Sequence, residues 1–218
     1  QRLPGRVINP ARSPAVANIN APFGFRHTSY QPGGAPDYQL SSYAINSSYA
    51  TQIGFGDPVC FSTNSAASPF IIQATGALAT AGPIIGIFQG CLYIPSAGGA
   101  PQYSPFFPAS VGAVATAYVL DAPNAQFFAQ SLNTAVTSAM IGQVFNFTTG
   151  QCSTVGGGFS IATIDQSTGT TSGAVVSLLP FRLTGLYPGL GNGSDPTTAF
   201  NVGRYCFNNQ IFRSTVGG

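Results

Sequence analysis

The longest apolar stretch of the chain reads Ile84-Ile-Gly-Ile-Phe-Gln-Gly-Cys-Leu-Tyr-Ile94. It is rich in β-branched and aromatic residues, which favour strands. Gly86 and Gly90 interrupt it, and glycines inside a strand often mark a bulge or a bend. The stretch therefore predicts a buried, bent strand in the centre of a sheet. No run approaches the roughly 18 apolar residues of a membrane-spanning helix, so no membrane partner is expected.

Short runs of similar texture lie on both sides of this stretch, and turn residues separate them. Residues 143–148 and 159–163 alternate apolar and polar side chains, the pattern of half-buried strands. Gly56-Asp-Pro58 predicts a turn. Further strands are expected at residues 43–45, 47–53, 59–61, 70–75, 114–120, 125–130, 174–185, 199–207 and 210–214. About a dozen short strands indicate an all-β fold, a jelly-roll-like or β-tulip-like sandwich or barrel.

The segments between these strands are expected to be loops, with at most one short helix. Helical spacing of apolar residues predicts that helix over residues 131–141. Residues 95–113 predict a long loop of the kind that usually binds something. Phe106 and Phe107 lie in it, and packing on a neighbouring molecule or on the parent domain are both open. Polar loops are expected over residues 164–173 and 187–196.

The N-terminal segment differs from the rest of the chain. Residues 1–36 hold six prolines, which interrupt every helix or strand window. The predicted organisation is an extended arm over residues 1–36 and a β-rich body over residues 37–218.

Charge is scarce and unevenly distributed. The chain has 218 residues, seven arginines, five aspartates, no lysine and no glutamate. Because charge normally keeps a free monomer soluble, this composition indicates a subunit of a larger assembly. Arg2, Arg6, Arg12 and Arg26 all precede the first acid, Asp37. Either this segment is simply disordered, or it lies on a partner surface that supplies carboxylates or phosphates. Four separated arginines do not indicate nucleic acid.

Residues suited to catalysis are few. His27 is the single histidine, and the aspartates fall near turns, where turn structure explains them. The four cysteines are far apart, so buried free thiols are expected rather than a zinc site or a disulfide framework. The glycine clusters at 156–158 and 189–193 predict turns. No catalytic, cofactor-binding or metal-binding residue is predicted, although a glycosidase pair of aspartates stays open.

Several short motifs, in order over residues 21–213, resemble a group of virion proteins of tailed bacteriophages. The sequence departs from that pattern at Ala122, Asn124 and Phe128, where the group carries acids. The motifs are Ala21-Pro-Phe-Gly-Phe-Arg26, Ser47-Ser-Tyr-Ala-Thr51, Gly56-Asp-Pro-Val59, Gly76-Ala-Leu-Ala-Thr-Ala81, Ile85-Gly-Ile-Phe-Gln-Gly90, and the segments 119–130, 181–186 and 202–210.

The resemblance implies a head decoration, or cement, protein without enzymatic activity or cofactor. Such a protein binds the outer surface of the head, stabilises the lattice of the major capsid protein and forms homotrimers. The capsid-binding residues expected on this basis are Arg2, Arg6, Arg12, Phe23, Phe25, Arg26, Phe106 and Phe107, with the arginines meeting carboxylates and Phe23 and Phe25 filling apolar pockets.

Two alternatives stay open. The first is another virion structural protein, such as a small jelly-roll coat, tail or fibre component. The second is a carbohydrate-binding or hydrolytic β-sandwich that uses aspartates and aromatic loops. The absence of tryptophan argues mildly against sugar binding.

Overall fold

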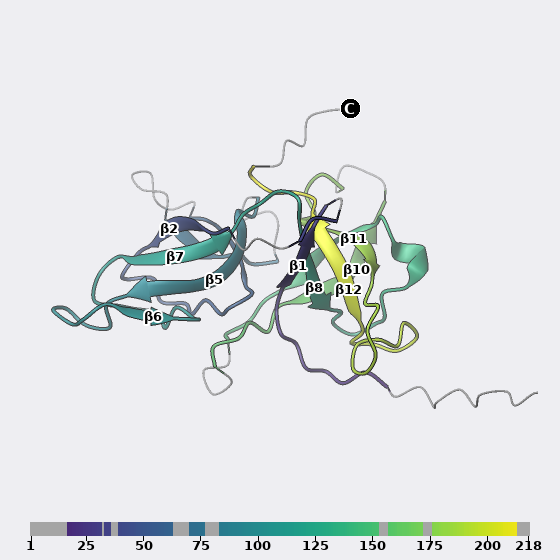
Figure 1. Cartoon of the computed structure of the whole chain (residues 1–218), viewed down its shortest axis with the longest axis horizontal. Coiled ribbons are helices and arrows are strands. Elements are labelled where there is room, and N and C mark those ends of the chain that lie inside the picture. Colours follow the sequence, from purple (N-terminus) through teal and green to yellow (C-terminus); the bar gives the residue numbers. More distant parts are fainter. Residues whose placement is uncertain are drawn as a thin grey trace, which may run out of the picture.

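The computed structural model describes residues 17–31, 33–35, 39–62, 70–76, 83–152, 157–171 and 176–212. Over these ranges the regular structure is twelve strands in two antiparallel sheets and one short 3-10 turn, which confirms the all-β prediction. The sheets form two lobes side by side (Figure 1). The polypeptide makes one strand of the first lobe, builds the whole second lobe, and then returns to complete the first.

The first lobe, here called the terminal lobe, has the strand order β1-β8-β12-β11-β9-β10. Ser131, directly after β8, forms a parallel bridge with Ile164 of β10, so the sheet curls until these two strands meet. The strands are β1 (Arg26–Tyr30), β8 (Ala125–Gln130), β9 (Val144–Thr148), β10 (Thr163–Thr170), β11 (Phe181–Leu186) and β12 (Val202–Phe207).

The second lobe, the inserted lobe, has the order β2-β7-β5-β3-β4, with β6 paired to β5. A parallel bridge between Ala44 and Phe70 brings its two ends together in the same way. The strands are β2 (Ser41–Ile45), β3 (Pro58–Phe61), β4 (Ile71–Gln73), β5 (Gly86–Tyr93), β6 (Gln102–Ser104) and β7 (Ala115–Leu120).

The predicted central strand is β5, which lies between β3 and β7 with its first six residues buried. Its bend falls at Gly90, where φ is +130° and the pairing with β7 shifts register. A side chain at this position would collide with Ser104 and Tyr103 of the neighbouring strand β6. The glycine is therefore required both by the backbone conformation and by the close approach of β6.

Each lobe has its own hydrophobic core, whereas the sequence predicted one β-rich body. The core of the terminal lobe is aromatic and continues across the contact with the inserted lobe through Ile87, Leu120 and Cys60. The core of the inserted lobe is mainly aliphatic and includes Phe88 and Phe107. All four cysteines are buried thiols outside any disulfide, as predicted.

The helix predicted over residues 131–141 is wrong. Only Ser138–Met140 forms a single 3-10 turn. The reason is competition for backbone donors: Ser131 donates to the Asn201 carbonyl, Leu132 to the Ile164 carbonyl, and Val136 to the Asn201 side chain. The backbone there is held by β10 and the start of β12 instead of by its own turns.

Two predicted loops contain strands. Residues 163–170 form β10, whose polar outer residues hid its strand character, and residues 102–104 form β6. No helix in the described ranges has the length and apolarity that a membrane crossing demands.

The boundary of the predicted arm also needs correction. Residues 26–30 form β1, which pairs with β8 as an integral strand of the terminal lobe. Phe25, expected to enter a pocket on a partner, is fully buried in its own core. Its ring stacks on Phe181 at a centroid distance of 4.2 Å and meets Phe127 and Phe147 edge-on.

Substituting Phe25→Ala should therefore lower the free energy of unfolding by about 3–5 kcal/mol, the usual cost of removing a buried ring. Chemical denaturation followed by fluorescence measures it. Phe23→Ala, at a half-buried position two residues earlier, is the matched control and should cost clearly less. Equal losses in the two variants would contradict the assigned role of Phe25.

Candidate functional site

The two lobes are joined along a seam, which we define as residues 53–57 of the inserted lobe together with residues 158–160 of the terminal lobe. The Phe55 amide donates to the Gly158 carbonyl (2.9 Å), and the Ser160 amide donates to the Phe55 carbonyl (3.0 Å). The Phe25 amide, just before β1, donates to the Gly56 carbonyl (2.9 Å). Backbone hydrogen bonds therefore link the lobes as neighbouring strands of a sheet would be linked.

Asp57 lies at the centre of the seam and is fully buried. Its Oδ2 accepts hydrogen bonds from the Gly54 amide (2.6 Å) and from Gln73 Nε2 (2.8 Å). Its Oδ1 accepts one from Ser160 Oγ (2.5 Å), which belongs to the other lobe. Burial raises the pKa of Asp57 to about 6, although these three donors favour the ionised form. The predicted turn at 56–58 thus carries a carboxylate that ties three segments together.

Arg26, the first residue of β1, is half-buried beside the seam, in a corner formed by two phenyl rings. Its Cζ is 4.6 Å from the ring centroid of Phe55 and 4.6 Å from that of Phe159. The rings come from different lobes and are nearly perpendicular, with centroids 6.1 Å apart. Partial burial removes water from the guanidinium and lowers the pKa of Arg26. We call these three residues the Arg26 clamp.

Phe106 packs on Gly158, the residue before Phe159, because a side chain at Gly158 would collide with the Phe106 ring. Phe159 is 47% exposed and Phe106 is half-buried. The seam therefore presents one cation with two aromatic rings against it, one of which is about half exposed.

The structure places Arg26 in the clamp and Phe106 on Gly158, which precedes Phe159 in the sequence. It separates Phe107 from them, because this side chain is fully buried in the core of the inserted lobe. The prediction that Phe25 and Phe107 contact a partner directly is corrected for this reason. Phe23 is half-buried. Arg2, Arg6 and Arg12 lie outside the described residues.

Sequence reasoning missed Phe55 and Phe159. The sequence places Phe159 in a predicted half-buried strand and Phe55 directly before the predicted turn at Gly56. Their proximity could not be predicted from local sequence, because the two residues are 104 positions apart and become neighbours through a β-bridge between the lobes.

The N-terminal segment is anchored at Asn18, at the far end of β8 from the lobe crossovers. Asn18 Nδ2 donates to the Asp195 carbonyl and to Thr198 Oγ1, both at 2.8 Å, and Oδ1 accepts from the Gly193 amide at 2.9 Å. Gln130, the last residue of β8, holds the Ile19 carbonyl and the Ala21 amide. Residues from Asn18 onward are therefore part of the folded lobe.

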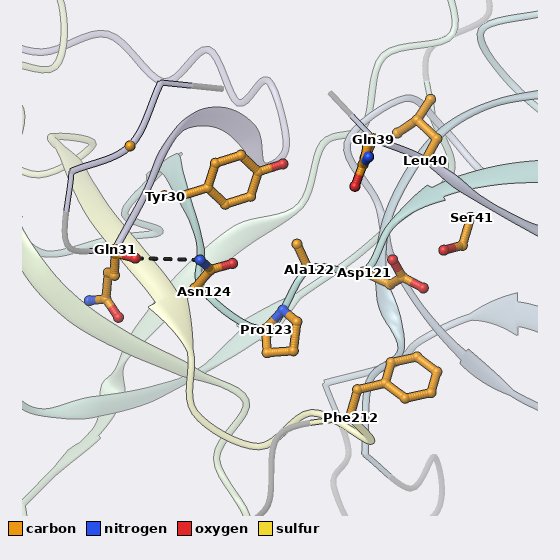
Figure 2. A pocket seen from close by; sticks show the side chains of 11 residues that line it. Tyr30, Gln31, Gln39, Leu40, Ser41, Asp121, Ala122, Pro123, Asn124 and Phe212 are labelled. Atoms are coloured by element: carbon orange, nitrogen blue, oxygen red, sulfur yellow. Dashed lines mark hydrogen bonds between the residues drawn. The ribbon is translucent and has the colours of Figure 1, made fainter. Parts of the chain in front are cut away.

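A groove of about 770 Å³ lies where the backbone passes from one lobe to the other. Figure 2 shows Tyr30 and Gln31 on one side, Gln39 to Ser41 on the other, and residues 121–124 between them. Among the described residues that line it, Asp121 is the charged one, and Phe212 completes the wall. Tyr43 donates to Asp121 Oδ2 at 2.7 Å. We call this the crossover groove.

The remaining chemical candidates are engaged locally. The Asp165 carboxylate accepts hydrogen bonds from Ser167, and the Asp195 carboxylate accepts them from Thr197. In both cases the donor lies two residues after the acid, as in an Asx turn. His27 packs against the Tyr30 ring at a centroid distance of 4.7 Å. The described residues contain no group of three or more His, Cys, Asp and Glu side chains that would hold a metal ion.

The fold and these sites define a two-lobed, all-β protein with a sparsely charged surface. No family model matches the sequence, and comparisons with curated proteins and with solved structures gave no match.

The pH dependence of stability should reveal the role of Asp57. Its folded pKa of about 6 exceeds the ordinary 3.8, so the folded state holds this proton more tightly than the unfolded state does. The stabilisation is full below about pH 4 and is lost as the pH rises through 6, a change of about 3 kcal/mol.

Asp57→Asn keeps an oxygen acceptor and should remove this contribution. The difference in unfolding free energy between wild type and Asp57→Asn should then change steadily between pH 4 and 7 in denaturant titrations. Asp57→Ala leaves the Gly54 amide and Gln73 without their acceptor and should destabilise at every pH. A difference between wild type and Asp57→Asn that stays constant with pH would refute the assignment.

Proposed function

We propose that this protein is a decoration, or cement, protein that binds the outer surface of a tailed-phage head and stabilises the lattice of the major capsid protein. The observation that carries the proposal is a surface with few charges and many exposed apolar side chains. Asp57 is withdrawn from the surface altogether, while Leu190 is 97% exposed. Among the described residues, the exposed large apolar side chains are Ile19, Leu40, Leu92, Tyr103, Val114, Ile141, Phe159, Ile161, Leu178, Leu190, Ile211 and Phe212.

Single exposed apolar residues are ordinary on monomers. They gain meaning here because the sequence supplies only 12 charged side chains to keep copies apart. A surface of this kind is stabilised when neighbouring subunits cover it. A subunit that binds only the assembled shell also stabilises that shell by mass action.

The N-terminal segment supports adhesion through its composition. Arg2, Arg6 and Arg12 precede the anchor at Asn18, and no acid accompanies them. Arginine forks bind carboxylates in two-point hydrogen bonds. We propose that this segment contacts acidic groups of the capsid, and that self-association into trimers multiplies weak contacts into firm attachment.

A truncation placed by the structure tests this proposal. Deleting residues 1–16 leaves Asn18 and its hydrogen bonds in place, whereas deleting residues 1–36 would remove Phe25 and β1. The shorter deletion should keep the wild-type melting temperature and lose at least about 10-fold in affinity for undecorated heads. Co-sedimentation with purified heads measures the affinity.

Arg2→Gln, Arg6→Gln and Arg12→Gln combined in the full-length protein form the matched variant, because this keeps the length and removes the charge. Unchanged binding of both variants would contradict the role of the segment. Electron cryomicroscopy of intact particles locates the protein on the head or on the tail. A position on the tail would favour the alternative of a tail or fibre component.

The crossover groove favours a second candidate function, carbohydrate binding. Amide side chains, the Asp121 carboxylate and the half-exposed Phe212 ring are groups that suit hydroxyls and the apolar face of a sugar. If the groove binds sugars, neutral disaccharides should shift the backbone amide signals of residues 121–124 in a saturable way. Phe212→Ala should weaken that response severalfold. The decoration proposal predicts no saturable response.

A further inference from the structure

The strongest unexplained feature of the structure is the environment of Arg26. The guanidinium carbon of Arg26 lies 4.6 Å from the ring centroids of both Phe55 and Phe159, and these centroids are 6.1 Å apart, so the two rings form a corner around the guanidinium. Its N–H groups are left to donate on the sides that the rings do not cover. Within the described residues, no acceptor or acid takes a hydrogen bond or ion pair from them. Arg182 makes the contrast, because it donates to the Gly142 carbonyl (2.8 Å) and to Asn208 Oδ1 (2.6 Å).

This arrangement has a free-energy consequence. A guanidinium that has lost part of its water and has no counter-charge gains more free energy from binding an anion than a fully hydrated one does. The rings also fix the side chain, so a ligand at its edge would cost little further rotamer entropy. The clamp therefore has the properties of a preorganised anion receptor.

We infer that the Arg26 clamp is a docking site for a carboxylate of a protein partner, either an Asp or Glu side chain or the terminal carboxylate, that lies next to an apolar residue. The carboxylate would accept two parallel hydrogen bonds from the Arg26 edge, and its apolar neighbour would pack on the exposed Phe159 ring. The inference rests on the proposed function only in taking this partner to be the capsid protein.

The surroundings favour a carboxylate over a phosphate or a nucleic acid. A phosphate backbone is normally bound by several cations together, and the other described arginines, Arg182 and Arg204, lie on β11 and β12 rather than at the clamp. The neighbours of Arg26 are aromatic, and such rings match a protein surface. A single guanidinium surrounded by aromatic rings is suited to bind one carboxylate that has an apolar residue next to it.

A direct probe tests the receptor without any capsid. The probe is N-acetyl-Asp-Phe-amide, a dipeptide whose two ends are blocked so that only the Asp side chain is charged. It is titrated into isotope-labelled full-length protein, and NMR follows the Arg26 Nε–H and the backbone amides of residues 158–160. We expect a saturable shift in the millimolar range. It should be at least about fivefold weaker with N-acetyl-Asn-Phe-amide, and also in Phe159→Ala.

Inorganic phosphate and a 12-residue oligothymidylate are the competing probes. Saturation by either one at lower concentration than the dipeptide would overturn the inference, as would no saturable response to the dipeptide. Arg26→Lys keeps the charge and loses the fork, so its amide response to the dipeptide should fall by about fivefold or more. An undiminished response in Arg26→Lys would also overturn it.

Binding to heads is the second readout. Arg26→Gln and Arg26→Lys should each weaken co-sedimentation with undecorated heads by about 10-fold, with melting temperatures close to wild type. A fall in melting temperature of equal size in both variants, with head binding unchanged, would show a purely structural role and overturn the inference. If wild type does not bind heads at all, the proposed function fails, and the dipeptide titration still decides the receptor.

Discussion

The buried carboxylate of Asp57 is the constraint on which the arrangement of the two lobes depends. An ionised carboxylate without partners could not stay in a site that water does not reach. Here both oxygens are satisfied, and the three donors come from its own turn, from Gln73 in β4 and from Ser160 in the other lobe. The same group therefore closes the turn, orders the edge of the inserted lobe and fixes the lobes to each other. Because the hydrogen bonds are directional, they specify one geometry, which apolar contact alone would do less sharply.

The seam also positions the Arg26 clamp. Phe25 is fixed by its buried ring and by the hydrogen bond that its backbone amide donates to the Gly56 carbonyl. Arg26 is the next residue, so its backbone position follows from that of Phe25. Phe55 belongs to the segment that ends in Asp57, and Phe159 precedes Ser160, the hydrogen-bond partner of Asp57. Each member of the clamp is thus one or two residues from a buried anchor, although none of the three is itself fully buried.

Local patterns in the sequence predicted the features that depend on local residues. The apolar run at residues 84–94 predicted β5 and its bend. The number of short strands predicted the all-β fold, and the wide spacing of the cysteines predicted buried thiols. Features set by distant partners could not be predicted in this way. The segment 26–30 looks like part of a proline-rich arm, and only pairing with β8, about 100 residues later, makes it a strand. Residues 131–141 have helical spacing, but donors taken by Asn201 and Ile164 prevent the helix. The Arg26 clamp could not be predicted from local sequence, because its three residues come together only when both lobes have folded.

Because the Arg26 clamp spans the contact between the lobes, binding of a partner there would also affect how the lobes are held together. A partner bound there would touch Phe55 of the inserted lobe and Phe159 of the terminal lobe at the same time. Any ligand that binds one arrangement of two bodies better than others stabilises that arrangement by its differential affinity. A carboxylate at Arg26 would therefore add to the hold of Asp57 and favour the docked lobes over separated ones. In a protein with so few charges, one cation placed across the lobe contact can serve both to recognise a partner and to stiffen the protein that binds it.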